Sequence, residues 1–136
     1  MKVLAIDYGA KRVGLAMGDS ETSLALPYEV LVDKNDTELV NRLKEIVAEE
    51  EVDTVIVGEP VTMAGKTSDQ TEKCREFAEF LKKYLSVTIE LVDERLTSRR
   101  ADAATFGAAI PTRSRDELAA MFLLQDYLDK QRNDNL

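Results

Sequence analysis

Four carboxylate side chains stand at positions from which they could together hold a hard metal ion. Three of them follow apolar, strand-like runs and one lies in the first turn of the predicted last helix: Asp7, Glu59, Glu94 and Asp116. Carboxylates gathered at one edge of a sheet raise one another's pKa unless a cation neutralises them. Mg²⁺ and Mn²⁺ prefer such oxygen ligands. Two such ions roughly 4 Å apart activate a water molecule and stabilise the leaving oxygen in phosphodiester hydrolysis.

Each acid also has a plainer interpretation when it is taken alone. Asp116 is favoured near a helix N-terminus by the helix dipole. Glu94 could pair with the adjacent Arg95, and Glu59 could be an ordinary polar loop residue. Asp7 is the hardest to explain in this way, because strand propensity does not favour aspartate at the end of a strand covered on both faces. A buried charge needs a compensating partner, so the metal hypothesis depends most on Asp7.

The composition excludes several other chemistries. The 136 residues include no histidine and a single cysteine, Cys74. Histidine-based triads, zinc fingers and nucleases with a histidine base are therefore excluded, and so is a disulfide framework. Cys74 falls at a core-facing helical position, which is typical of an inert buried thiol. No run is long and apolar enough to span a membrane and no signal peptide is evident, so the expected compartment is the cytoplasm.

The formal net charge of −8 argues against a general binder of polyanions. The charges are segregated, however: residues 36–53 hold seven acids against two cations, and residues 95–115 hold five arginines against Asp102. Cations in the predicted rim loops and first helical turns are the candidates for phosphate contacts with nucleic acid. They are Lys11, Arg12, Lys66, Arg95, Arg99, Arg100, Arg113 and Arg115. Each could equally be a solubilising surface cation.

The positions of the acids depend on the elements that precede them. Alternating or continuous apolar runs predict strands at 2–7, 12–18, 24–32, 52–58 and 87–92, and helical spacing predicts helices at 36–50 and 69–84. Gly9 suits a turn position with positive φ. A short helix capped by Thr97 or Ser98, a loop at 107–112 and a last helix with a Ser114–Glu117 capping box follow. From Lys130 the tail is polar, and we expect it to be disordered.

Three hairpin-connected strands followed by two right-handed crossovers predict one mixed sheet of order 3-2-1-4-5, with helices on both faces. This is a ribonuclease H-like α/β architecture in a single domain spanning 1–136. Pro27 cannot donate to a ladder and therefore favours the edge for the third strand. The first, fourth and fifth strands run parallel, so their carboxyl ends form one rim, where open α/β sheets bind ligands.

The residues at this rim resemble a known family. The segments AIDYGAKRVGLAMGD, VIVGEPVTMAGK, VDERLTSRRA and RDELAAMFLLQDYLD are similar to those of the YqgF/RuvX family of small ribonuclease H-like proteins. The resemblance runs from Lys2 to about Asp129. It implies a catalytic and metal-binding triad of Asp7, Glu94 and Asp116 with Mg²⁺ or Mn²⁺.

The resemblance also implies a hydrolase that cuts structured nucleic acid, with processing of the 5′ end of pre-16S rRNA in ribosome biogenesis as the leading expectation. Resolution of Holliday junctions in DNA is the alternative, and a catalytically silent nucleic-acid-binding module is a third. After the fourth strand the family usually has Gly-Leu-Pro, whereas this chain has Gly58-Glu59-Pro60. Glu59 is thus an extra acid, which either joins the metal cluster or only adds charge.

An actin-like ATPase shares the Asp-x-Gly and hairpin pattern, but such enzymes hold nucleotide between two lobes, and no Walker motif is present. No residue pattern distinguishes RNA from DNA as the substrate, or a monomer from a homodimer.

Overall fold

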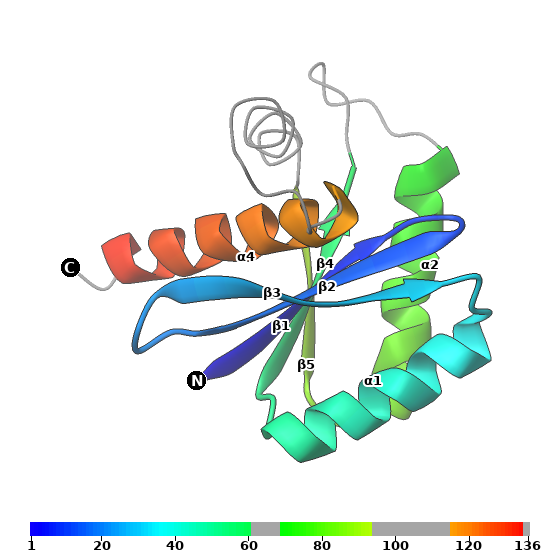
Figure 1. Cartoon of the computed structure of the whole chain (residues 1–136), viewed down its shortest axis with the longest axis horizontal. Helices are drawn as coiled ribbons and strands as arrows, with labels where there is room; N and C mark the ends of the chain where they lie inside the picture. Colours follow the sequence, from blue (N-terminus) through cyan, green and yellow to red (C-terminus); the bar gives the residue numbers. More distant parts are fainter. Residues whose placement is uncertain (61–68, 94–114, 135–136) are drawn as a thin grey trace.

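The computed structural model describes residues 1–60, 69–93 and 115–134, with residues 115–117 and 134 described by their backbone alone. Five strands form one sheet in the order β3-β2-β1-β4-β5 (Figure 1). β1 and β3 pair antiparallel with β2, while β4 pairs parallel with β1 and with β5. The predicted five-stranded mixed sheet is confirmed. Its strands are β1 (Lys2–Tyr8), β2 (Arg12–Asp19), β3 (Leu24–Val32), β4 (Thr54–Glu59) and β5 (Thr88–Asp93).

Helices cover both faces of the sheet. α1 (Asp36–Glu50) connects β3 to β4 and α2 (Asp69–Tyr84) connects β4 to β5, and α1 and α2 lie on one face. α4 (Arg115–Asp134) crosses the other face (Figure 1). Among the described residues, no helix is long and apolar enough to cross a membrane.

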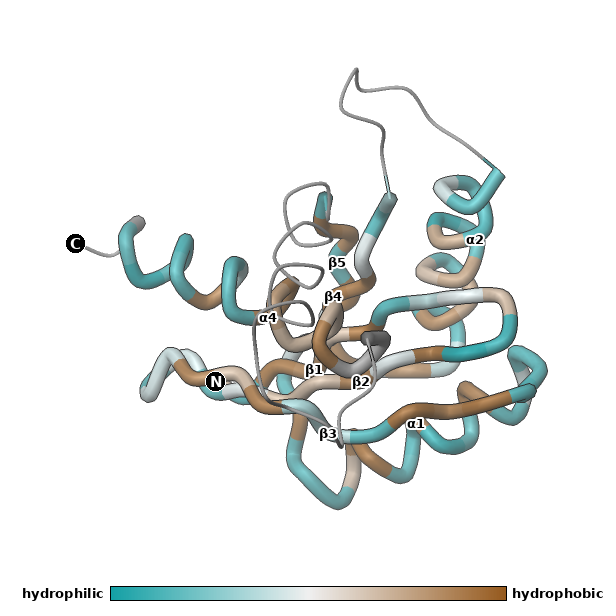
Figure 2. Tube along the Cα trace, turned by 45° about the horizontal axis from the view of Figure 1, so that its top comes forward, coloured by the Kyte–Doolittle hydropathy of each residue, from teal (hydrophilic) through white to brown (hydrophobic). Residues whose placement is uncertain are grey.

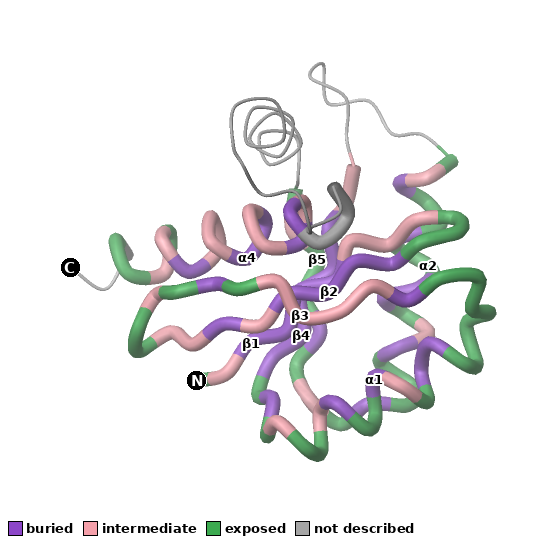
Figure 3. Tube along the Cα trace, viewed as in Figure 1, coloured by how far each residue is buried: buried purple, intermediate pink, exposed green. Residues whose placement is uncertain are grey.

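The alternation of side chains along β1 divides the core into two clusters. Leu4 and Ile6 pack with apolar residues of α1 and α2, whereas Val3 and Ala5 pack beneath α4. All four side chains are fully buried. In Figures 2 and 3 the strands at the centre of the sheet are largely hydrophobic and buried, whereas the helices alternate between buried and exposed residues. Because successive strand residues face opposite sides, the face of each residue follows from its place in this alternation.

The edge strand β3 carries the irregularity that Pro27 predicts. Its pairing with β2 shifts between Leu15, opposite Glu29, and Ala16, opposite Pro27, so that Tyr28 is passed over. A proline has no N–H to give to a ladder, and a bulge on an edge strand is where it is tolerated. The prediction that the third strand lies at the edge is confirmed.

α1 begins at the predicted position because Asn35 caps it. The Asn35 side chain accepts a hydrogen bond from the Glu38 amide (2.8 Å), and the Glu38 carboxylate accepts one from the Asn35 amide (3.1 Å). This reciprocal capping box satisfies two amides that the first helical turn leaves unpaired. The helix ends at Glu51, whose left-handed backbone (φ 55°) turns the chain toward β4.

α4 lies very close to the sheet because β2 offers it a glycine. A Cβ atom on Gly18 would be 3.0 Å from a methyl carbon of Leu128 and 3.1 Å from one of Leu124. The Gln125 side chain fixes the helix to the edge of the sheet: its oxygen accepts from the Ala25 amide (3.1 Å) and its nitrogen donates to the Ser23 carbonyl (2.7 Å). These contacts hold the carboxyl half of α4 over the β2–β3 hairpin.

The prediction of a disordered tail from Lys130 is wrong as far as residue 134, because α4 continues to Asp134. The Gln131 amide nitrogen donates to the Tyr127 hydroxyl oxygen (2.9 Å), one helical turn earlier. Burial, followed by a hydrogen bond to Glu90 of β5, raises the pKa of Tyr127 to about 12. Tyr127 thus ties α4 to β5, and the Gln131 hydrogen bond continues from it along the helix.

The predicted short helix after Thr97 or Ser98 and the predicted loop at 107–112 lie outside the described residues. The same holds for Ser114, so the capping box of the last helix stays a prediction. Residue 115 begins α4, as expected.

Candidate metal centre at the carboxyl edge of the sheet

Asp7 lies near the carboxyl end of β1, on the face that α4 covers. Val3 and Ala5 belong to the α4 cluster, and Asp7 is the next residue in that alternation. Its side chain is half-buried. The four residues before Asp7 are fully buried. The structure therefore places an ionisable group at the end of a buried strand, as the apolar run in the sequence predicts.

The positions directly beside Asp7 in the two neighbouring strands are glycines. Asp7 pairs with Gly14 of β2. On the other side the parallel pairing with β4 ends with Ile6 opposite Val57, so Gly58 is the next residue of β4 beside Asp7. Both glycines are buried. Neither of the two positions directly beside Asp7 in the sheet therefore carries a side chain.

β5 also contributes residues to the face of the sheet that α4 covers. Val92 pairs with Gly58 and packs against the α4 cluster. Glu90, two residues earlier, hydrogen-bonds Tyr127 of α4, so even-numbered residues of β5 face α4. Glu94 has the same parity as Glu90 and Val92 in the sequence, but it lies outside the described residues.

Asp116 is the second residue of α4, and its backbone is described but its side chain is not. Leu124 and Leu128 pack over Gly18, which pairs with Val3 at the start of β1. The carboxyl half of α4 therefore covers the amino-terminal end of β1. In Figure 1 its first turn lies toward the other end of β1, and Asp7 is near that end of the strand.

Glu59 does not lie on this face. β4 extends through Glu59, and Val55, Val57 and Glu59 alternate toward α1 and α2. The Glu59 carboxylate accepts a hydrogen bond from Arg75 Nε of α2 (2.6 Å), and its side chain is only 15% exposed. The extra acid is thus paired with a cation on the opposite face of the sheet from Asp7.

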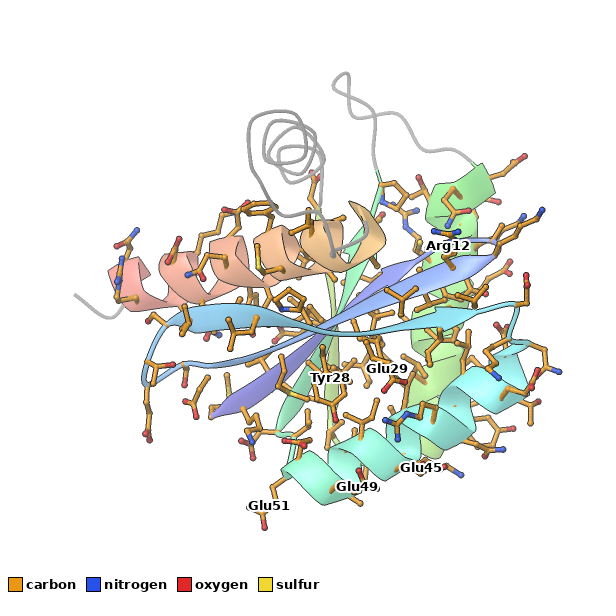
Figure 4. The ribbon with its side chains drawn as sticks, in the orientation of Figure 1. Arg12, Tyr28, Glu29, Glu45, Glu49 and Glu51 are labelled. Atoms are coloured by element: carbon orange, nitrogen blue, oxygen red, sulfur yellow. The ribbon has the colours of Figure 1, made fainter. Side chains whose placement is uncertain are left out.

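Lys11 and Arg12 are both exposed at the turn that follows Asp7. The Asp33 amide donates to the Lys11 carbonyl (2.8 Å), which ties this turn to the end of β3. Gly9 is required here by space and not by a positive φ: a Cβ atom would stand 2.6 Å from the Arg12 carbonyl oxygen. Figure 4 shows Arg12 away from Glu45 and Glu49 of α1 and from Glu51, which caps that helix. The predicted separation of these acids from the arginines of residues 95–115 stays a prediction, because residues 94–114 lie outside the described part of the chain.

The other predicted phosphate contacts cannot be placed in the same way. Arg115 begins α4 and is described by its backbone alone. The remaining cations lie outside the described residues: Lys66, Arg95, Arg99, Arg100 and Arg113. Within the described part of the chain, no three Asp, Glu or Cys side chains are grouped so as to hold a metal ion. Of the three acids in the predicted triad, only Asp7 has its side chain described.

Residues 1–130 match the family described as RuvX, Holliday junction resolvase. The chain belongs to the RuvX family. A relative from Dictyoglomus thermophilum, provisionally named as a pre-16S rRNA nuclease, is 35% identical over 98% of this chain and 99% of its own length. A relative from Rickettsia canadensis with the same name is 36% identical over 94% of this chain and 86% of its own length.

Solved structures of similar shape share this chain's fold. The RuvC protein of T. thermophilus, in complex with a Holliday junction substrate, has a TM-score of 0.65 at 15% identity and covers 97% of this chain and 96% of its own. The fowlpox virus resolvase with Holliday junction DNA has a TM-score of 0.59 at 11% identity, covering 96% and 99%. The predicted ribonuclease H-like fold is confirmed.

The structure also shows what fixes the end of β1, which the sequence analysis missed. The Gln70 side chain of α2 donates to the Tyr8 carbonyl oxygen (2.6 Å), and the Tyr8 hydroxyl donates to Asp36 at the start of α1 (2.8 Å). The Tyr8 ring stacks on Phe77, with centroids 4.2 Å apart. Burial first, and then the hydrogen bond to Asp36, raise the pKa of Tyr8 well above its ordinary value. In the sequence, only the tyrosine that follows Asp7 indicates these contacts.

Proposed function

We propose that this RuvX-family protein is a metal-dependent endonuclease that hydrolyses phosphodiester bonds in structured nucleic acid, with precursor 16S rRNA as its substrate. Asp7, Glu94 and Asp116 are the proposed metal ligands. The observation that carries the proposal is the place of Asp7: a half-buried carboxylate at the carboxyl edge of the sheet, flanked by two glycines and facing α4.

The geometry of α4 supports the inclusion of Asp116. Eight residues of helix separate Asp116 from Leu124, about 12 Å along the helix axis. Four residues of strand separate Asp7 from Val3, about 13 Å. Leu124 packs over Gly18, the partner of Val3, so this part of α4 lies over the start of β1. Because the two lengths are similar, the beginning of α4, with Asp116, is expected near Asp7 at the other end of the strand. Glu94 is included as the third ligand because it directly follows β5, in which Val92 packs against the α4 cluster, and because the family resemblance implies it.

This donor set fits a hard divalent ion. Carboxylate oxygens are the ligands that Mg²⁺ and Mn²⁺ prefer, and the positions directly beside Asp7 in the neighbouring strands are the glycines Gly14 and Gly58. When bound, such ions activate the attacking water and stabilise the leaving oxygen. The chain's own part is to hold the carboxylates ionised and aligned, and to bind the phosphate backbone through Lys11 and Arg12 at the adjacent turn.

The RNA substrate is proposed from the relatives, since two that cover nearly the whole chain are provisionally named as pre-16S rRNA nucleases. Branched DNA is the second candidate, favoured by the family's description as a Holliday junction resolvase. Symmetric resolution of a four-way junction needs two active sites and therefore a homodimer, whereas trimming of rRNA needs one.

The decisive experiment compares cleavage of a precursor 16S rRNA fragment and a synthetic four-way junction, each with Mg²⁺ or Mn²⁺. The variants are Asp7→Asn and, as a matched control, Glu59→Gln, a carboxylate at the same edge but on the opposite face. We expect Asp7→Asn to lower the cleavage rate by at least about 100-fold, because metal stabilisation of the transition state is worth several kcal/mol. Glu59→Gln should retain cleavage.

Cleavage by Asp7→Asn at the wild-type rate would remove the proposed mechanism. Metal-dependent binding of nucleic acid without turnover by the wild type would instead establish the silent binding module. Faster cleavage of the junction than of the rRNA would make branched DNA the first candidate substrate.

A further inference from the structure

A pocket opens on the face of the sheet opposite Asp7. It has a volume of about 490 Å³ and lies between the turn after β1, the first turn of α1 and the side of α2. This is within the usual range of small-ligand pockets, roughly 300–1,000 Å³. We call it the α2 pocket. The side chains that matter for its chemistry are Tyr8, Asp36, Gln70, Lys73, Glu76 and Phe80.

The apolar part of the α2 pocket is aromatic. The chain has four tyrosines and four phenylalanines, and Tyr8, Phe77 and Phe80 all line this pocket. Tyr8 is stacked on the fully buried Phe77, and Phe80 is half-buried. Because Phe77 has almost no exposed surface, the half-buried rings of Tyr8 and Phe80 are the ones on which a planar ring can stack.

The polar part of the α2 pocket supplies hydrogen-bond acceptors and one cation. Asp36 accepts from the Tyr8 hydroxyl through one oxygen, which leaves its second oxygen for a ligand. Glu76 and Lys73 are exposed, and within the described residues neither makes a hydrogen bond or an ion pair. Gln70 uses its amide nitrogen on the Tyr8 carbonyl, so its oxygen is a further acceptor.

We propose that the α2 pocket binds an unpaired guanine base of the nucleic-acid substrate. The inference rests on the proposed nuclease function. A base released from a loop or a junction is recognised by stacking on aromatic side chains and by hydrogen bonds to its Watson–Crick edge. Guanine presents two adjacent N–H donors on that edge, N1–H and N2–H, which match the two oxygens of one carboxylate. Glu76 supplies that carboxylate, and Lys73 meets the nucleotide's phosphate.

The position of the pocket relative to Asp7 suits this assignment. Asp7 and Tyr8 are neighbours in β1 and face opposite sides of the sheet. Ala10, in the turn that carries Lys11 and Arg12, also lines the pocket. A strand held by these two cations over the end of β1 would pass both Asp7 and the mouth of the pocket. One nucleotide can thus be bound on the α2 side while a neighbouring phosphodiester lies at the candidate metal centre.

An arginine side chain of a basic protein is the competing occupant, because Asp36 and Glu76 outnumber Lys73 in the pocket. Lys73 at the pocket and the exposed Lys11 and Arg12 at the adjacent turn would repel a basic peptide, whereas they attract a nucleotide phosphate. The observations therefore favour the nucleotide, and the peptide becomes an outcome of the test.

The test uses a fluorescent reporter that the chain lacks. Because the sequence contains no tryptophan, Phe80→Trp introduces a single indole at the pocket. The full-length variant is titrated with GMP, AMP, CMP, UMP, ribose 5-phosphate and N-acetyl-argininamide. Stacking on a base is expected to quench the indole in a saturable way, at the lowest concentration with GMP, and ribose 5-phosphate is expected to have no effect.

Two further measurements guard against disturbance of the pocket by the reporter. In the unmodified protein, GMP should shift the backbone NMR signals of Gln70, Lys73 and Glu76. In the reporter background, Glu76→Gln should weaken GMP binding by about 5- to 150-fold, the range for loss of one bidentate contact to a base. Glu79→Gln, one turn along α2 and paired with Lys82, is the matched control and should change nothing.

The proposal is overturned if no nucleotide binds saturably, if Glu76→Gln and Glu79→Gln weaken binding equally, or if N-acetyl-argininamide binds and GMP does not. Failure of the nuclease function is a separate result. Glu76→Gln should raise KM for RNA cleavage with kcat retained, whereas unimpaired cleavage by Asp7→Asn would remove the metal mechanism and leave GMP binding standing.

Discussion

The Gln70 side chain and the Tyr8 carbonyl oxygen form a 2.6 Å hydrogen bond between residues 62 positions apart in the chain. Tyr8 directly follows Asp7, so α2 fixes the backbone at the candidate metal ligand. We predict that Gln70→Ala lowers the free energy of unfolding by about 0.5–1.5 kcal/mol, the usual net value of one hydrogen bond. It should also lower kcat more than it raises KM, because the ligand is positioned less well.

Urea denaturation and steady-state cleavage kinetics measure the two effects of Gln70→Ala. Gln131→Ala, which removes a hydrogen bond to Tyr127 near the end of α4, is the control. It should cost similar stability and leave kcat unchanged. An equal loss of kcat in both variants would show that Gln70 acts through stability alone.

A second prediction concerns the ion pair that ties α1 to the edge strand. Arg42 donates to both carboxylate oxygens of Glu29, at 2.7 and 2.9 Å, and this hydrogen bonding lowers the pKa of Glu29 from 4.5. Figure 4 shows Glu29 on the side of β3 that faces α1. Because the folded-state pKa is the lower one, the ion pair contributes stability above pH 4.5, and this is lost as the pH falls through the folded-state value.

Glu29→Gln should therefore lower the free energy of unfolding at pH 7 by about 1 kcal/mol. The difference from the wild type should shrink below pH 4.5 and vanish at still lower pH. Urea denaturation at several pH values measures it. Glu45→Gln removes the other partner of Arg42. The Glu45 side chain is 61% exposed, so this variant should lower the free energy of unfolding by less. A pH-independent difference between Glu29→Gln and the wild type would contradict the electrostatic explanation.

The contact between α4 and β2 gives a third prediction. In Gly18→Ala, the new methyl group would stand 2.8 Å from the Leu24 carbonyl oxygen and near Leu124 and Leu128. Backbone on one side and packed side chains on the other leave little room for adjustment, so we expect a loss of about 1–3 kcal/mol in the free energy of unfolding. Ser20→Ala, two residues along, is the control for this region and should change stability by less than about 0.5 kcal/mol. Thermal and urea denaturation distinguish the two.

The sequence predicts the sheet well because its constraints are local. Short turns force β1, β2 and β3 into hairpins, and the two crossover helices then leave one arrangement for β4 and β5. Pro27 marks the edge by its missing N–H. The place of Asp7 follows in the same way, since the apolar run before it ends at a rim that the topology defines.

The face of Glu59 could not be predicted, because it depends on where β4 ends. If the strand stops at Gly58, Glu59 belongs to a loop and is free to join the other acids. One more residue of strand puts it into the alternation with Val55 and Val57, toward Arg75. The contact of Gln70 with Tyr8 was missed for a different reason: no local pattern relates a side chain of α2 to a carbonyl of β1.

The last prediction tests the metal centre without any nucleic acid. An ion that binds only the folded protein raises its stability by RT ln(1 + [L]/Kd), about 2.7 kcal/mol at 100 times Kd. Saturating Mn²⁺ should therefore raise the Tm of the wild type by about 5–10 °C. Asp7→Asn should lose most of this rise, because it removes one of the three proposed ligands. Glu59→Gln should keep it, because Glu59 is paired with Arg75 on the opposite face. Equal shifts in all three proteins would mean that Mn²⁺ binds elsewhere on this acidic chain.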